Sequence, residues 1–121
     1  MTTKAELYLI ALSELENSTG DIISTAIVTH DGLIMACTRS DLRQKEIFAA
    51  YGAATYKRAG DTMEELSGEN IDMLLYESKN HMVVTVRAGE HALLIALTGR
   101  NVQMGLVIMN VQKAAQKIKE L

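Results

Sequence analysis

The sequence has few of the residues that build disulfide frameworks, cysteine-based metal sites or flexible linkers. It contains no proline and no tryptophan, and Cys37 is its single cysteine. One thiol can form neither an internal disulfide nor a metal cage, which argues against a disulfide-stapled secreted scaffold. Because proline and low-complexity tracts are both absent, nothing marks a linker between domains. We therefore expect residues 1–121 to form a single domain.

Basic patches and aromatic residues are also scarce. The 12 Lys and Arg residues are scattered from Lys4 to Lys119 and are outnumbered by 15 Asp and Glu, so that the net charge is -3. The aromatic residues are one Phe and four Tyr. Nucleic-acid binding relies on clustered positive charge, and single-strand binding adds aromatic rings on which bases stack. We therefore predict no nucleic-acid partner.

The chain also lacks a long hydrophobic run. None approaches the roughly 18 residues that a transmembrane helix needs. The N-terminal region, acidic at Glu6 and Glu14, does not have the layout of a signal peptide. We therefore predict no membrane span and a cytoplasmic location.

What the sequence does have is a long helical pattern over residues 41–67 that is apolar on two sides. One side can lie on the chain's own sheet, and the other has no obvious partner within the chain. We favour a second copy of the same helix as that partner, because residues 48–54 are mostly small and allow close approach; the alternative is burial in one larger core. The first stripe consists of Phe48, Gly52, Ala59, Met63 and Leu66, and the second of Ile47, Ala50, Tyr51 and Ala54.

Two further helices and five strands complete the expected pattern. A capping box from Thr3 to Glu6 predicts the start of the first helix, and Asn101 is the expected N-cap of the last one. Ser40 or Asp41 is the expected N-cap of the long helix. The expected strands are residues 22–29, 33–38, 71–77, 82–87 and 91–98, the first two joined by an Asp-Gly hairpin turn.

The order of these elements is α-β-β-α-β-β-β-α, which predicts an α/β fold of the α+β type with a five-stranded antiparallel sheet. Residues 22–29 are rich in β-branched side chains and carry apolar residues at both odd and even positions. Both faces of this strand are therefore apolar, as in a central strand covered on both sides. Helices must then lie on both faces of the sheet, in three layers.

The side chains that could perform chemistry do not form a recognisable site. Cys37 has no local His or Asp signature and is best explained as a small core residue. His81 and His91 begin neighbouring strands and should lie at opposite ends of their ladder, too far apart to share a metal. His30 lies in a turn. We therefore predict no enzyme activity, no metal site and no cofactor.

Three stretches of the chain together resemble one known family. Residues 26–36, AIVTHDGLIMA, look like the first hairpin of the Roadblock/dynein light chain family. The alanine-rich start of the long helix at residues 46–54 is similar too. So are residues 92–97 followed by residues 101–106, which correspond to the last strand and the glycine-containing start of the final helix. The resemblance covers nearly the whole chain.

This resemblance implies a homodimer in which the third strands pair edge to edge, with strand order 2-1-5-4-3 and the long helices side by side. The edge strand at residues 71–77 has no proline or lysine that would protect it, which favours the same pairing. The expected dimer interface consists of Ile47, Ala50, Tyr51, Ala54, Arg58, Ile71, Met73 and Leu75.

Members of this family typically bind small Ras-like GTPases as regulators or scaffolds, and some accelerate hydrolysis without supplying an arginine finger. The resemblance therefore implies a non-enzymatic, homodimeric adaptor that binds and regulates a small Ras-like GTPase. Two alternatives stay open. One is a structural scaffold of the same fold for larger or motor-type assemblies without GTPase contact, and the other is a small-ligand sensor domain, which would need a polar-lined pocket.

Overall fold

The computed structural model describes residues 2–39 and 41–121 and has the expected order of elements. The helices are α1 (Lys4–Ser18), α2 (Leu42–Ser67) and α3 (Met104–Lys119). The strands are β1 (Ile22–Thr29), β2 (Ile34–Cys37), β3 (Met73–Glu77), β4 (His81–Arg87) and β5 (Ala92–Gly99). The predicted α+β class is therefore confirmed.

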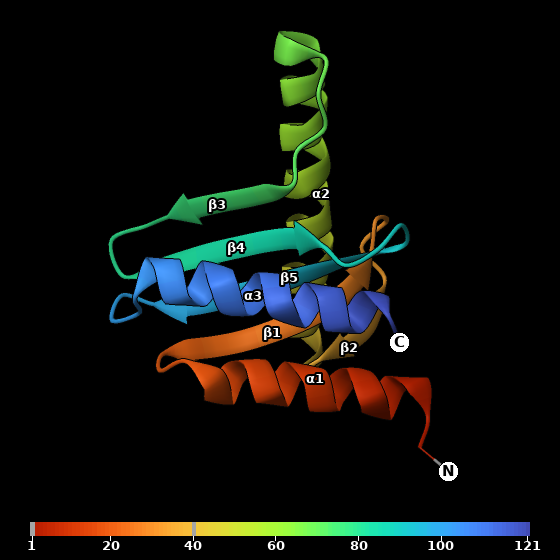
Figure 1. The fold of residues 1–121 in the computed structure, drawn as a ribbon, viewed down its shortest axis with the longest axis vertical. Coiled ribbons are helices and arrows are strands. Elements are labelled where there is room, and N and C mark those ends of the chain that lie inside the picture. The colour runs from red at the N-terminus through yellow and green to blue at the C-terminus, as the bar shows by residue number, and fades with distance from the viewer. Residues whose placement is uncertain (1, 40) are drawn as a thin grey trace.

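The five strands form one antiparallel sheet in the order β2-β1-β5-β4-β3 (Figure 1). This confirms the order that the family resemblance implies. β1 and β2 are joined through Gly32, whose φ of 87° is a conformation that glycine adopts most easily. Since β2 and β3 are the outer strands, each has one backbone edge that pairs with no other strand in the described parts of the chain.

Helices cover both faces of the sheet, as the strand pattern predicts. α1 and α3 lie on one face (Figure 1), over a core that includes the fully buried Leu12, Leu94 and Val111. α2 lies on the other face, where Ala49 and Ile95 are fully buried. We call these the α1/α3-side core and the α2-side core. No helix in residues 2–39 and 41–121 combines the length and the apolar character needed to cross a bilayer.

The N-caps of the first two helices agree with the sequence. The hydroxyl of Thr3 accepts a hydrogen bond from the backbone N–H of Glu6 at 3.1 Å. At the start of α2, Asp41 Oδ1 accepts from the N–H of Gln44 at 2.9 Å. Ser40, the other candidate cap, lies outside the described residues. Each bond satisfies a donor that the first helical turn would otherwise leave unpaired.

The expectation that Asn101 caps α3 is wrong. α3 begins at Met104, and its N-cap Gln103 makes no capping bond with its side chain. The backbone N–H of Asn101 instead donates to Asp21 Oδ2 at 3.0 Å. The turn after β5 is thus held by a residue 80 positions earlier, which a local capping pattern cannot reveal.

The first stripe predicted for α2 is only partly correct. Gly52 is buried and Phe48 half-buried, but Met63 and Leu66 are 40% and 78% exposed. The reason is that α2 crosses the sheet near one end of the strands, and its C-terminal part extends beyond β3 (Figure 1). We call this extension, from Gly60 to Ser67, the overhang. The buried residues of α2 are Ala49, Gly52, Ala53 and Tyr56.

Candidate protein interface

Five of the predicted interface residues form a stripe on the side of α2 that faces away from the sheet. Ile47 is 40% exposed and Tyr51 is 70% exposed, and Ala50, Ala54 and Arg58 are exposed as well. At 3.6 residues per turn this stripe lies opposite the buried residues of α2. We call it the outer stripe. It carries an aromatic ring and aliphatic groups with no cover from the described part of the chain.

The other three predicted interface residues lie in or just before β3, and they divide between the two faces of the sheet. Ile71 packs against the α2-side core, and Leu74 does so as well. Met73 and Leu75 pack against the α1/α3-side core. The side chains of Met73 and Leu75 therefore point away from α2. A second copy lying beside β3 would therefore meet the free backbone edge of this strand and not the side chains of Met73 and Leu75.

A further apolar surface was not anticipated from the sequence. Tyr76 pairs with Val83, and Val83 pairs with Leu97, so these side chains form a row across β3, β4 and β5. Val83 packs against the α2-side core, which places the row on the α2 face. Because α2 crosses only one end of the strands, Tyr76 is 42% exposed and the other two are half-buried. The alternation of side chains along each strand could have predicted that these three residues share a face of the sheet. It could not have predicted that α2 leaves them uncovered.

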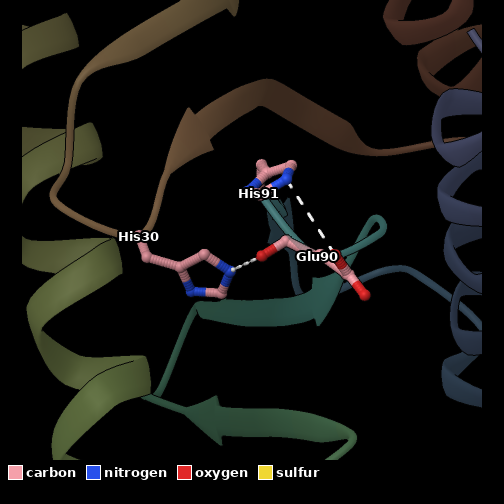
Figure 2. Close-up of polar contacts among 3 residues, drawn as sticks. All are labelled: His30, Glu90 and His91. Atoms are coloured by element: carbon pink, nitrogen blue, oxygen red, sulfur yellow. Dashed lines mark hydrogen bonds and ion pairs between the residues drawn. The ribbon is translucent and has the colours of Figure 1, made fainter.

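A polar surface lies at the end of the sheet where β1 ends and β5 begins. His30 Nε2 lies 3.0 Å from the carbonyl oxygen of Glu90 (Figure 2), and since a carbonyl only accepts, this nitrogen carries the proton and donates it. His91 Nε2 lies 4.0 Å from Glu90 Oε2 on the exposed turn between β4 and β5. The His30 bond ties the first hairpin turn to this last one.

Tyr56 links α2 to the segment that leads into β3. Its hydroxyl donates to the carbonyl oxygen of Ile71 at 3.0 Å. Burial raises the pKa of the Tyr56 phenol, while the nearby positive charge of Arg87 lowers it and the negative charge of Asp72 raises it. A cavity of about 270 Å³ lies beside this tyrosine.

The residues considered for catalysis lie apart from one another. Cys37 is half-buried on β2 and packs against the α2-side core, as a small hydrophobic residue would. His81 pairs with Gly99 at one end of the β4–β5 ladder, and His91 lies beyond the other end, as predicted. Within residues 2–39 and 41–121, no three His, Cys, Asp or Glu side chains are grouped so that they could hold a metal ion.

Known structures and relatives share this fold. A Roadblock/LC7 domain from Streptomyces avermitilis superimposes with a TM-score of 0.87 at 16% identity, covering 92% of this chain and 93% of that one. The gliding protein MglB from Thermus thermophilus gives 0.86 at 18% identity, covering 99% and 91%. At these identities the likeness concerns the fold. An uncharacterized protein of Methanocaldococcus jannaschii, MJ1340, is 29% identical over 105 residues, or 87% of this chain and 91% of its own length.

The match to a family model is broader than any single motif. The model of the Roadblock/LC7 domain matches residues 9–98, from the middle of α1 to the end of β5. That span includes the hairpin, the start of the long helix and the last strand, on which the resemblance in the sequence rested; residues 101–106, which were also part of it, follow the matched span. The chain therefore belongs to the Roadblock/LC7 domain family.

Proposed function

We propose that this chain is a cytoplasmic, non-enzymatic adaptor that forms a homodimer through α2 and β3 and binds and regulates a small Ras-like GTPase. The observation that carries the dimer is the exposed apolar surface of α2 beside the free edge of β3. The GTPase partner rests on what membership of the family implies. Apolar patches and long unprotected strand edges are normally covered in native assemblies.

A second copy can cover these surfaces at the same time. If two β3 strands pair antiparallel about a two-fold axis, one sheet continues into the other. The overhang of each copy then lies above the uncovered row of its partner, which starts at Tyr76. Met63 and Leu66 would bury apolar area there, and the β3 edges would satisfy each other's hydrogen bonds.

The outer stripe has one of two roles in this arrangement. It points away from the sheet, so it either lines the seam between the two α2 helices or stays free for the GTPase. The sequence favours the first role. Ala54→Arg, compared with Leu66→Arg in the overhang, separates the two roles. A charge buried in an apolar contact disrupts that contact, while the same charge on a free surface does not.

Sedimentation velocity at tens of micromolar tests the dimer. We expect a dimer for the wild type and a monomer for Leu66→Arg, whose charge would enter the overhang contact. Met109→Arg is the matched control, because Met109 is 49% exposed on α3, on the other face of the sheet. Ala54→Arg should give a monomer if the outer stripe lines the seam. A monomeric wild type, or a dimeric Leu66→Arg, would contradict the proposed arrangement.

Binding measurements test the GTPase. Each small Ras-like GTPase encoded in the same genome would be loaded with GDP or with a non-hydrolysable GTP analogue, and its binding and hydrolysis measured with and without this protein. We expect one GTPase to bind in a nucleotide-dependent manner. If Ala54→Arg stays dimeric but loses this binding, the outer stripe belongs to the GTPase. A stable dimer that binds none of them in either state would favour the scaffold.

A further inference from the structure

The cavity beside Tyr56 lies on the flank of α2 that faces away from Met63 and Leu66. It has a volume of about 270 Å³, is open to solvent, and is lined by α2, by the segment that leads into β3, and by the sheet ends that carry His30 and Arg87. On a 3.6-residue helix, positions 57, 61 and 64 project to one side and positions 63 and 66 to another. The overhang contact proposed for Met63 and Leu66 would therefore lie on a different side of α2 from the charged residues of the cavity.

The floor of the cavity is apolar. It is lined by Ala53, Tyr56 and Ile71. Gly60 gives it room, because a Cβ at this position would lie 3.7 Å from Ile71 Cγ1 and would occupy the space above that side chain. Such a floor suits the aliphatic part of a small ligand, since small-molecule sites combine apolar walls with a few polar groups.

Charges of both signs line the cavity walls without pairing to each other. Lys57 and Arg87 are positive, and Asp61 and Glu64 are negative. In residues 2–39 and 41–121, the ion pairs within 4.0 Å lie elsewhere, between α1 and α3 and in the β4–β5 turn. The four side chains are exposed, so little is lost when a ligand reorganises them.

The two signs are separated along the helix. Arg87 is the last residue of β4 and therefore belongs to the sheet, and Lys57 lies one turn before Asp61 on α2. Asp61 and Glu64 follow on the overhang, about 6 and 10 Å farther along the helix axis at 1.5 Å per residue. The cavity therefore has a positive end at the sheet and a negative end toward the overhang.

We propose that this cavity binds a small zwitterion of the amino-acid class. Its carboxylate would face Lys57 and Arg87, its ammonium group would face Asp61 and Glu64, and its methylene groups would lie on Ile71. A charge-assisted hydrogen bond at each end gives the site its selectivity. The distance between the two ends favours a ligand whose charges are several bonds apart over an α-amino acid such as glycine.

NMR titration of the ¹⁵N-labelled protein tests this site. The probes are glycine and 6-aminohexanoate, with butyrate and butylamine as matched compounds that carry one charge only. We expect saturable shifts of the amides from Lys57 to Glu64 with 6-aminohexanoate, weaker binding of glycine, and no saturation with the singly charged compounds. Arg87→Gln and Glu64→Gln should each weaken 6-aminohexanoate by about tenfold.

Two control variants keep the result interpretable. Glu65→Gln removes a carboxylate from the next position of α2, and Arg43→Gln removes a cation from its exposed start, and neither residue lines the cavity. Both should bind 6-aminohexanoate as the wild type does. The proposal is overturned by absence of saturable shifts, by equal binding of butyrate or butylamine, or by equal affinity in all four variants. The spectra themselves report whether each variant is folded.

Discussion

Replacing Gly99 with alanine should destabilise the protein by about 2 kcal/mol, although the residue lies at the end of a strand. A Cβ on Gly99 would overlap the carboxylate of Asp21, with its Cγ and Oδ1 only 2.5 Å away. Real Cβ atoms do not approach other atoms so closely, so the carboxylate or the strand must move.

Asp21 cannot move without cost. Its backbone has φ of 68°, in the left-handed region, and its carbonyl accepts the N–H of Gly99 at 2.8 Å. Its Oδ2 accepts the N–H of Asn101 at 3.0 Å. A displaced carboxylate loses this last bond, which is exposed and contributes about 1 kcal/mol, and residual crowding adds about 1 kcal/mol more.

Urea and thermal unfolding at one protein concentration measure the effect. A loss of 2 kcal/mol corresponds to a fall in Tm of roughly 6–10 °C for a domain of this size. Asp21→Gly removes the carboxylate and tolerates the positive φ. In that background Gly99→Ala should cost less than about 0.5 kcal/mol, because nothing is left to collide with.

The reasoning would be refuted by an equal cost of Gly99→Ala in both backgrounds. Gly105→Ala is the matched control, because Gly105 lies in the first turn of α3 and a Cβ there would meet nothing within 4 Å. Helix propensity predicts that this substitution is neutral or stabilising by up to about 1 kcal/mol.

Three further predictions concern other parts of the fold. If β3 pairs across the dimer, amides of residues 73–76 should lose hydrogen-exchange protection as the protein is diluted through dimer dissociation; concentration-independent protection would exclude the pairing. Because burial raises the pKa of Tyr56, the stability that it contributes is present below about pH 10 and is lost as the pH rises through the folded pKa. Tyr56→Phe should therefore lose about 1 kcal/mol at neutral pH, with its bond to Ile71, and show a shallower decline in urea unfolding above pH 10. Cys37→Ser should leave partner binding unchanged and cost at most some stability; lost binding with an unchanged melting curve would reveal a chemical role for the thiol.

The sequence by itself was sufficient for the elements and their order. The range predicted for the first strand, residues 22–29, is that of β1. The spacing i, i+3, i+4 and i+7 of Tyr8, Ala11, Leu12 and Leu15 predicts one apolar stripe on the first helix, and these four are the buried residues of α1. Both features depend on local periodicity, since side chains alternate along a strand and recur every 3.6 residues in a helix. The requirement for helices on both faces follows from the same alternation. The strand order came from the family resemblance and not from periodicity.

Only the tertiary structure decided which apolar residues are covered. The helical pattern of α2 continues to Leu66, and no local sequence signal shows that the last two turns of the helix extend beyond the edge of the sheet. The cavity beside Tyr56 needs residues from α2, from the segment that leads into β3 and from the ends of two other strands. The hydrogen bond from His30 to the carbonyl oxygen of Glu90 likewise joins residues 60 positions apart in the sequence. Periodicity places a side chain on a face of its own element, whereas its neighbours depend on where that element ends relative to the others, which only the packed chain determines.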